Sequence, residues 1–215
     1  MHASKNNCRL VILISGRGSN MKHIVQVIEQ RNLPAEVCAV IANKADAQGL
    51  QWAQEKGITT QVVAHKDYAT REQFDNALAQ AVAQYCPDYV LLAGFMRVLT
   101  PVFIDRFEGR IINIHPSLLP LFPGLNTHQK ALDAGVQWHG CTVHLVTAEL
   151  DSGPIIAQGL VPVFQDDTAE QLAARLLPIE HQTYAQVVEW LAFDLVQIDG
   201  TRPVQVLGVK HRGVI

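Results

Sequence analysis

The sequence predicts an α/β fold with an open, mostly parallel, twisted sheet and helices on both faces. Short apolar runs alternate with stretches of helical spacing over residues 9–115, and this alternation is typical of parallel sheets. The first run, RLVILIS (9–15), is apolar throughout its interior, as in a strand covered on both faces. The Gly-rich segment GRGSN (16–20) then leads into a helix, so the chain opens as a βαβ unit.

The later elements follow from their own patterns. Apolar residues recur at helical spacing after position 20, where Ser19 or Asn20 can cap the helix. Further strands are expected at 36–43, 60–64, 89–94 and 109–115. Further helices are expected at 46–57, stopped by Gly57, and at 70–86, ended before Pro87.

The pattern changes after residue 127. A short helix is expected at 128–135, and the next two strands, 139–147 and 154–163, are expected to be antiparallel. A closing helix at 168–193 begins at Asp167 or Thr168, and a hairpin around Asp199-Gly200 is possible in the tail. Because no linker divides the chain, we expect one domain.

Composition narrows the class of protein. Of 215 residues, 48% are hydrophobic and 17% charged, which favours a packed core over disorder. The net charge of −3, without a basic stripe, argues against a nucleic-acid surface. The N-terminal apolar run is too short for a membrane span and lacks a signal-peptide pattern, so we expect a cytoplasmic protein with reduced cysteines.

The turn GRGSN has the features of an anion site. Gly16 and Gly18 allow close backbone approach, and a helix start presents free N–H groups. The dinucleotide fingerprint needs a third glycine where Met21 stands, so one phosphate fits better than a pyrophosphate. A tight turn without a ligand explains the same residues.

A second candidate site lies at the end of the expected strand GRIINIH (109–115). Asn113 and His115 point to the same face, and Pro116 keeps His115 extended. An amide and an imidazole together suit a carbonyl under attack, because both can donate to an oxygen that becomes negative. Asp151, in ELDSGP, could orient an imidazole. A turn-forming aspartate and a core histidine explain the same residues without any function. The spacing along the sequence does not place Asp151 near His115.

Two other chemistries are disfavoured. His128, His139 and His144 lack metal-ligand spacing, so no metal is expected. No serine lies in G-x-S-x-G, which argues against a serine nucleophile.

Seven segments together carry a family resemblance: ISGRGSN, NKADAQGL, LAGFMRVL, NIHPSLLP, FPGLNTH, HGCTVH and ELDSGP. They resemble the phosphoribosylglycinamide formyltransferases, a folate-dependent family of purine synthesis, over residues 9 to about 193. The resemblance implies a single formyltransferase domain over 1–215, with a nucleotide-binding half (9–115), a folate and catalytic half (116–193) and a C-terminal tail (194–215).

The resemblance also implies the reaction and its residues. The formyl group of 10-formyltetrahydrofolate passes to the amine of glycinamide ribonucleotide by direct attack through a tetrahedral intermediate. Asn113, His115 and Asp151 match the catalytic trio. The substrate-binding residues implied are Gly18, Ser19, Asn20 and Glu180. The folate-binding residues implied are Arg71, Met96, Arg97, Val98, Leu99 and Asn113. Departures from the family pattern stand at Leu121, Asn126, Ala148 and Leu177.

Four other functions fit the sequence less well. Methionyl-tRNA formyltransferase usually adds a basic C-terminal domain, and formyltetrahydrofolate deformylase an N-terminal one. A nicotinamide-dependent oxidoreductase would need an acidic residue ending the second strand, where Asn43 and Lys44 stand. A non-catalytic binding protein would not need the intact trio. We expect small-molecule substrates, no nucleic-acid or membrane partner, and a monomer or homodimer.

Overall fold

The computed structural model describes residues 7–198 and 204–214. Its large sheet contains β1 (Cys8–Ile14), β2 (Ala35–Ala42), β3 (Thr60–Val62), β4 (Tyr89–Leu92), β5 (Ile111–His115), β6 (Trp138–Leu145), β7 (Ile155–Pro162) and β10 (Gly213–Val214). The helices are α1 (Ser19–Arg31), α2 (Gln48–Glu55), α3 (Arg71–Ala83), α4 (Pro101–Ile104), α5 (Thr127–Asp133) and α6 (Ala169–Ala192). Two short 3₁₀ segments, His65–Asp67 and Asp105–Phe107, complete the connections between them.

The eight strands lie in the order β10-β7-β6-β5-β4-β1-β2-β3. Strands β1 to β5 pair in parallel, while β6 is antiparallel to both β5 and β7. This confirms the predicted α/β fold class and the antiparallel pair in the second half. Parallel strands end at the same edge, so the loops after β1, β4 and β5 meet there.

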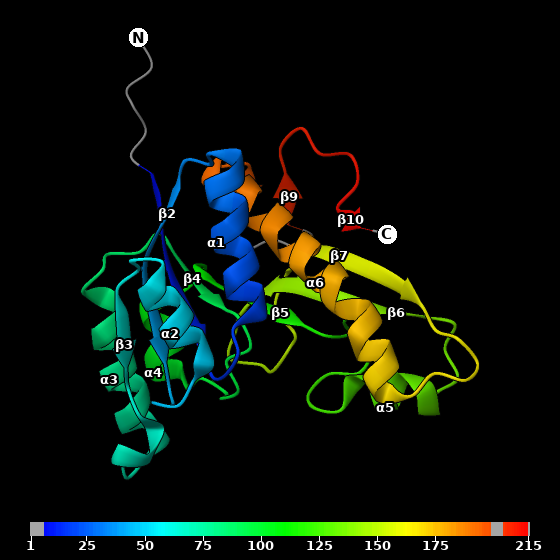
Figure 1. The fold of residues 1–215 in the computed structure, drawn as a ribbon, viewed down its shortest axis with the longest axis horizontal. Helices are drawn as coiled ribbons and strands as arrows, with labels where there is room; N and C mark the ends of the chain where they lie inside the picture. Colours follow the sequence, from blue (N-terminus) through cyan, green and yellow to red (C-terminus); the bar gives the residue numbers. More distant parts are fainter. Residues whose placement is uncertain (1–6, 199–203, 215) are drawn as a thin grey trace.

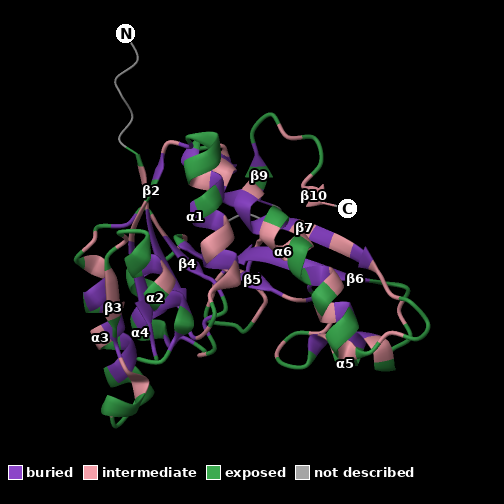
Figure 2. Cartoon of the chain, viewed as in Figure 1, coloured by how far each residue is buried: buried purple, intermediate pink, exposed green. Residues whose placement is uncertain are grey.

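Helices cover both faces of this sheet, and β1 shows why its sequence is apolar in every interior position. Leu10 and Ile12 pack into the core beneath α1, α2 and α6, whereas Val11 and Leu13 pack into the core beneath α3 and α4. All four side chains are fully buried. Figure 1 shows α1 and α6 side by side over one face, and Figure 2 shows the buried strands between the exposed outer faces of the helices.

Two helix starts differ in how well the sequence predicts them. The capping position of α1 is Gly18, with a φ of 65° and no side-chain cap, so the prediction of Ser19 or Asn20 as the cap was wrong. Both residues lie inside the first turn instead. At α6 the cap is Thr168, one of the two predicted, and its side chain forms a capping box with Gln171.

The C-terminal tail adds one feature that the sequence did not predict, because β10 extends the large sheet by pairing in parallel with β7. In the same tail, β8 (Val196–Gln197) pairs antiparallel with β9 (Gln205–Val206), on either side of the position where a hairpin was predicted. The hairpin predicted around Asp199-Gly200 lies outside the described residues. Within 7–198 and 204–214, none of the helices has the length and apolar character needed to cross a membrane.

Candidate active site

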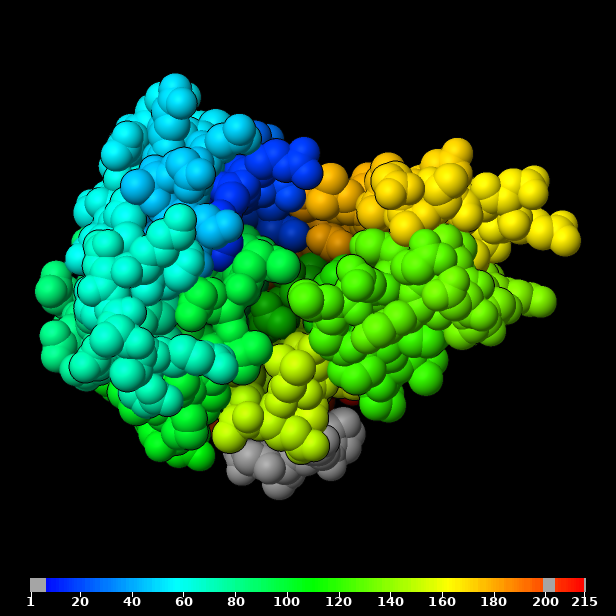
Figure 3. Space-filling view, turned by 90° about the horizontal axis from the view of Figure 1, so that it is seen from below, coloured from blue at the N-terminus to red at the C-terminus, as the bar shows by residue number. Residues whose placement is uncertain are grey.

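A cavity of about 290 Å³ lies at the sheet edge where β1 and β4 end. Figure 3 looks onto this face, with the blue Gly-rich loop and the green loops beside a central hollow. The cavity is lined by Ser15, Gly16, Arg17, Gly18, Ser19, Asn20, Lys44, Ala93, Gly94, Met96 and Glu180. All three residues predicted to hold a phosphate are therefore at one cavity, together with Glu180 from α6.

The Gly-rich loop is shaped by its backbone. Gly18 has a left-handed φ of 65°, and a Cβ there would lie 3.0 Å from Met21 Cε. The N–H of Gly49, in the first turn of α2, donates to the carbonyl oxygen of Gly16 at 3.0 Å, which ties the loop to the next helix. The first N–H groups of α1 have no partner within the helix, so this end of the cavity offers donors to an anion.

Asn20 and Glu180 meet across the cavity wall. The Asn20 Nδ2 group donates to Glu180 Oε2 at 3.2 Å, which joins the first turn of α1 to the middle of α6. Burial raises the pKa of the Glu180 carboxyl, and the Asn20 hydrogen bond opposes that rise. Leu177, one turn earlier on α6, is 38% exposed and has no polar atom to share a ligand's hydroxyl groups with Glu180.

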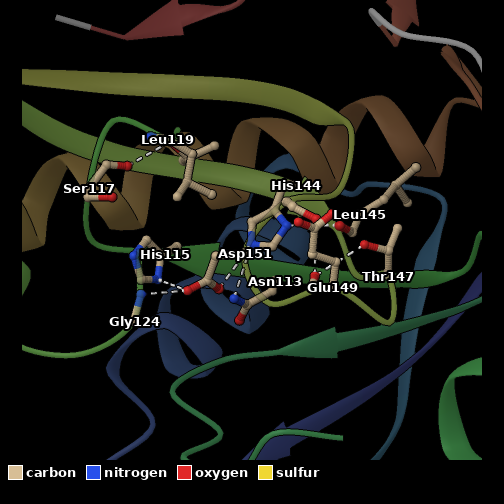
Figure 4. Close-up of polar contacts among 12 residues, drawn as sticks. Asn113, His115, Ser117, Leu119, Gly124, His144, Leu145, Thr147, Glu149 and Asp151 are labelled. Atoms are coloured by element: carbon tan, nitrogen blue, oxygen red, sulfur yellow. Dashed lines mark hydrogen bonds and ion pairs between the residues drawn. The ribbon is translucent and has the colours of Figure 1, made fainter. Parts of the chain in front are cut away.

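The predicted trio is brought together by the antiparallel half of the sheet. Asn113 and His115 lie on β5, and Asp151 lies in the turn between β6 and β7. Asp151 Oδ2 is 3.5 Å from His115 Nδ1, and both side chains are 8% exposed. Figure 4 shows the carboxylate between His115, Asn113 and the loop after β5. The structure thus supplies the proximity that sequence spacing could not.

The loop after β5 completes the surroundings of His115 and Asp151. His115 Nε2 is 3.1 Å from the carbonyl oxygen of Phe122, and the N–H of Gly124 donates to Asp151 Oδ2 at 2.9 Å. Both ring nitrogens of His115 therefore face acceptor oxygens. The ring is held in one orientation from which it can donate a hydrogen bond.

Backbone geometry in the β6–β7 turn directs the Asp151 carboxylate. Asp151 has a positive φ of 50°, which is uncommon for a residue with a side chain. Two residues later, a Cβ at Gly153 would lie 1.7 Å from the carbonyl oxygen of Leu145. The close approach of Gly153 to β6 requires glycine at that position.

The predicted folate-binding residues form a neighbouring surface. Arg71, at the start of α3, donates to the carbonyl oxygen of Val98. Met96 and Val98 are 66% and 52% exposed, while Arg97 lies over the Phe74 ring. Exposed apolar side chains beside a guanidinium fit a flat, partly anionic ligand. Leu99 differs, because its side chain is buried in the core and only its backbone is available to a ligand.

Sequence reasoning missed several residues that shape this site. Ser15 Oγ accepts a hydrogen bond from the N–H of Met96 at 2.8 Å and so joins the loops after β1 and β4. His144, considered only as a metal ligand, faces Asn113 across the sheet. Two signals pointed to His144: its place on a strand expected to join the sheet, and its position in HGCTVH, one of the segments that carry the family resemblance.

The other two histidines that were weighed as metal ligands form a separate pair. His128 Nδ1 and His139 Nε2 are 3.1 Å apart, and burial lowers the pKa of His139 to about 4. In the part of the chain that the structure describes, no three histidine, cysteine or acidic side chains are placed to hold a metal ion.

Comparison with known proteins identifies the class to which this fold and site belong. The family model described as formyl transferase matches residues 8–188, and the chain belongs to this family. The family implies a folate co-substrate, and the chain is a formyl transferase enzyme.

The most similar relatives are more specific. The chain is 46% identical to phosphoribosylglycinamide formyltransferase of Escherichia coli K12, over 85% of this chain and 86% of that protein. It is 42% identical to the Haemophilus influenzae protein of the same name, over 85% and 86%. Glycinamide ribonucleotide transformylase 1 of Symbiobacterium toebii matches with a TM-score of 0.91 at 41% identity, over 96% and 97% of the two chains. The resemblance predicted from the sequence is confirmed.

Proposed function

We propose that this chain transfers the formyl group of 10-formyltetrahydrofolate to the amine of glycinamide ribonucleotide. The observation that carries the proposal is the convergence of Asn113, His115 and Asp151 at the sheet edge where the Gly-rich loop also lies, in a chain of the formyl transferase family. The products are formylglycinamide ribonucleotide and tetrahydrofolate.

The proposed binding mode uses both surfaces of the site. The substrate phosphate sits on the backbone N–H groups of Gly18, Ser19 and Asn20, and the ribose hydroxyl groups bind Glu180. The folate lies along Arg71 and residues 96–99. These positions are supported by the cavity that the loop and Glu180 share, and by the exposed apolar side chains beside Arg71.

The proposed chemistry needs no covalent enzyme intermediate. The substrate amine forms a bond to the formyl carbon, whose oxygen becomes negative. This oxygen accepts a hydrogen bond from Asn113, and a second one from His115 once it replaces the Phe122 carbonyl oxygen at Nε2. The carbon–nitrogen bond to the folate then breaks, and Asp151 relays the proton lost by the amine to the departing folate nitrogen, which gives tetrahydrofolate. One donor to a developing oxyanion is worth roughly 100- to 1,000-fold in turnover. Holding two substrates together supplies a comparable or larger factor.

We also propose that the chain acts as one domain in the cytoplasm, on small molecules. The uninterrupted eight-stranded sheet, to which the Gly-rich loop and the trio both attach, supports the single domain. Relatives named as enzymes of small-molecule synthesis support the substrate class. We propose that it acts as a monomer or a homodimer, two states that sedimentation distinguishes.

The function is tested by following tetrahydrofolate release from 10-formyltetrahydrofolate with and without glycinamide ribonucleotide. We expect release only when the ribonucleotide is present, with one formylated product per folate released. Equal release without an acceptor would instead indicate a hydrolase. No release under either condition would contradict formyl transfer from this folate.

Replacing Glu180 by glutamine is expected to weaken ribonucleotide binding about tenfold and leave folate binding unchanged, because a hydrogen bond to a charged acceptor is lost. Titration of the two ligands separately measures this. Equal losses for both ligands would contradict a ribose-binding role.

The same variant has an expected pH signature in stability. Burial raises the pKa of Glu180 in the folded chain, so the parent binds this proton more tightly when folded than unfolded. The Glu180 contribution to the stability of the parent should therefore fall as pH rises above about 4, the ordinary value for glutamate. Glu180→Gln removes this loss, so its melting temperature relative to the parent should increase between pH 4 and 7. A constant difference would contradict the burial argument.

A further inference from the structure

His144 lies opposite Asn113 in the antiparallel register of β5 and β6. Its side chain is 2% exposed, and burial lowers its pKa. The titratable groups that face it are Asp151, which opposes that lowering, and His115, which adds to it. The ring is therefore neutral at physiological pH and carries a single proton.

The surroundings of the ring determine which nitrogen holds that proton. His144 Nδ1 is 2.8 Å from the carbonyl oxygen of Leu145, which can only accept a hydrogen bond. The proton therefore belongs on Nδ1, and Nε2 carries a lone pair. Asp151 Oδ1 is 3.9 Å from Nε2, so no hydrogen bond joins these two acceptors.

This tautomer determines whether the NH₂ group or the oxygen of the Asn113 amide faces His144. Asn113 Nδ2 is 3.2 Å from His144 Nε2, and a lone pair there accepts from the NH₂ group but would repel the amide oxygen. The NH₂ group has two hydrogens, and His144 uses one. The second remains for a ligand in the partly exposed space beside Asn113, next to Asp151 (Figure 4).

We propose that His144, as its Nδ1-protonated tautomer, is a positioning residue that holds the NH₂ end of Asn113 toward the reacting formyl oxygen. The catalytic consequence rests on the proposed function, whereas the tautomer and the amide orientation do not. A second proton on His144 would remove the acceptor at Nε2 and direct an N–H toward Asp151. The amide oxygen of Asn113 would then face His144, and the orientation needed for the oxyanion would be lost.

The tautomer is tested without substrate, by ¹⁵N NMR of the histidine ring nitrogens in the parent protein at neutral pH. We expect His144 to show a protonated Nδ1 and an unprotonated Nε2, assigned by comparison with His144→Gln. A protonated Nε2 would overturn the proposal. This measurement stands whether or not formyl transfer is observed.

The positioning role is tested by steady-state kinetics of His144→Phe and Asn113→Ala, alone and combined. His144→Phe should lower kcat at least tenfold with KM for both substrates changed less than twofold, because the lost orientation matters only when the oxyanion forms. The double variant should be no slower than Asn113→Ala, since His144 acts through Asn113. Multiplied losses would overturn the proposal.

His144→Gln serves as the conservative variant, because its amide oxygen can replace Nε2 as an acceptor for Asn113. It should recover at least half of the kcat lost in His144→Phe. Because glutamine does not titrate, it should also lose the fall in kcat at low pH that protonation of the His144 imidazole causes in the parent. Recovery no greater than for His144→Phe would overturn the proposal. If His144→Phe does not fold, the comparison of His144→Gln with the parent, together with the NMR result, decides.

Discussion

Asp151→Asn should fold like the parent and lose at least 100-fold in kcat. The side chain keeps its shape, and its oxygen can still accept from the N–H of Gly124, which donates to the carboxylate at 2.9 Å in the parent. The negative charge beside His115 Nδ1 is lost, so the amide can neither stabilise an imidazolium nor take up the amine proton. General acid–base groups of this kind contribute roughly 100- to 10,000-fold.

The measurement is kcat for formyl transfer alongside the thermal melting curve. Asp133→Asn is the matched control, because Asp133 is an exposed acid on α5, away from the site. It should retain parental turnover. An Asp151→Asn enzyme with turnover within threefold of the parent would remove Asp151 from the mechanism.

Gly18→Val should abolish measurable ribonucleotide binding while folate binding persists. A branched side chain is strained at a φ of 65°, and its Cβ would crowd Met21 at 3.0 Å. Because valine resists this left-handed φ, the turn relaxes to another conformation, which moves the backbone N–H groups proposed to hold the phosphate. Ser19→Ala, which keeps the backbone, should cost only about 1 kcal/mol of binding, the value of one hydrogen bond.

Gly57→Val separates backbone strain from ligand binding. Gly57 also has a left-handed φ, 73°, with open space around a Cβ, and it lies after α2, outside the residues lining the cavity. Both valine variants should lose stability, by about 1–2 kcal/mol from the left-handed conformation alone. Only Gly18→Val should lose the ribonucleotide, as measured by titration calorimetry. Parental binding by Gly18→Val would show that the phosphate lies elsewhere.

The parallel half of the fold could be predicted from sequence because its signals are local. Buried strands such as β1 are continuous apolar runs, and the Gly-rich turn must follow the strand at the ligand-binding edge. Boundaries were less accurate, as at α1, where Gly18 rather than a polar side chain precedes the helix. A glycine that adopts a left-handed φ leaves no capping pattern to detect.

The candidate site was only partly predictable because its contacts are distant in sequence. Asn113 and His115 share a face through strand periodicity alone. The approach of Asp151 to His115 depends on the register of β5, β6 and β7, which no local pattern specifies. The same register sets His144 opposite Asn113, so its importance could not be seen before the pairing was known.

Gly153 extends the site to a residue that contacts no proposed ligand. A Cβ at position 153 would lie 1.7 Å from the carbonyl oxygen of Leu145, and that oxygen is 2.8 Å from His144 Nδ1, from which it can accept a hydrogen bond. The displacement needed to relieve this contact would move the neighbouring turn that carries Asp151. A substitution at position 153 alone is therefore not tolerated by this backbone. A chain with another residue at this position would need a matching change in the β6 backbone. The turn and the Leu145 carbonyl group are therefore expected to change together in evolution.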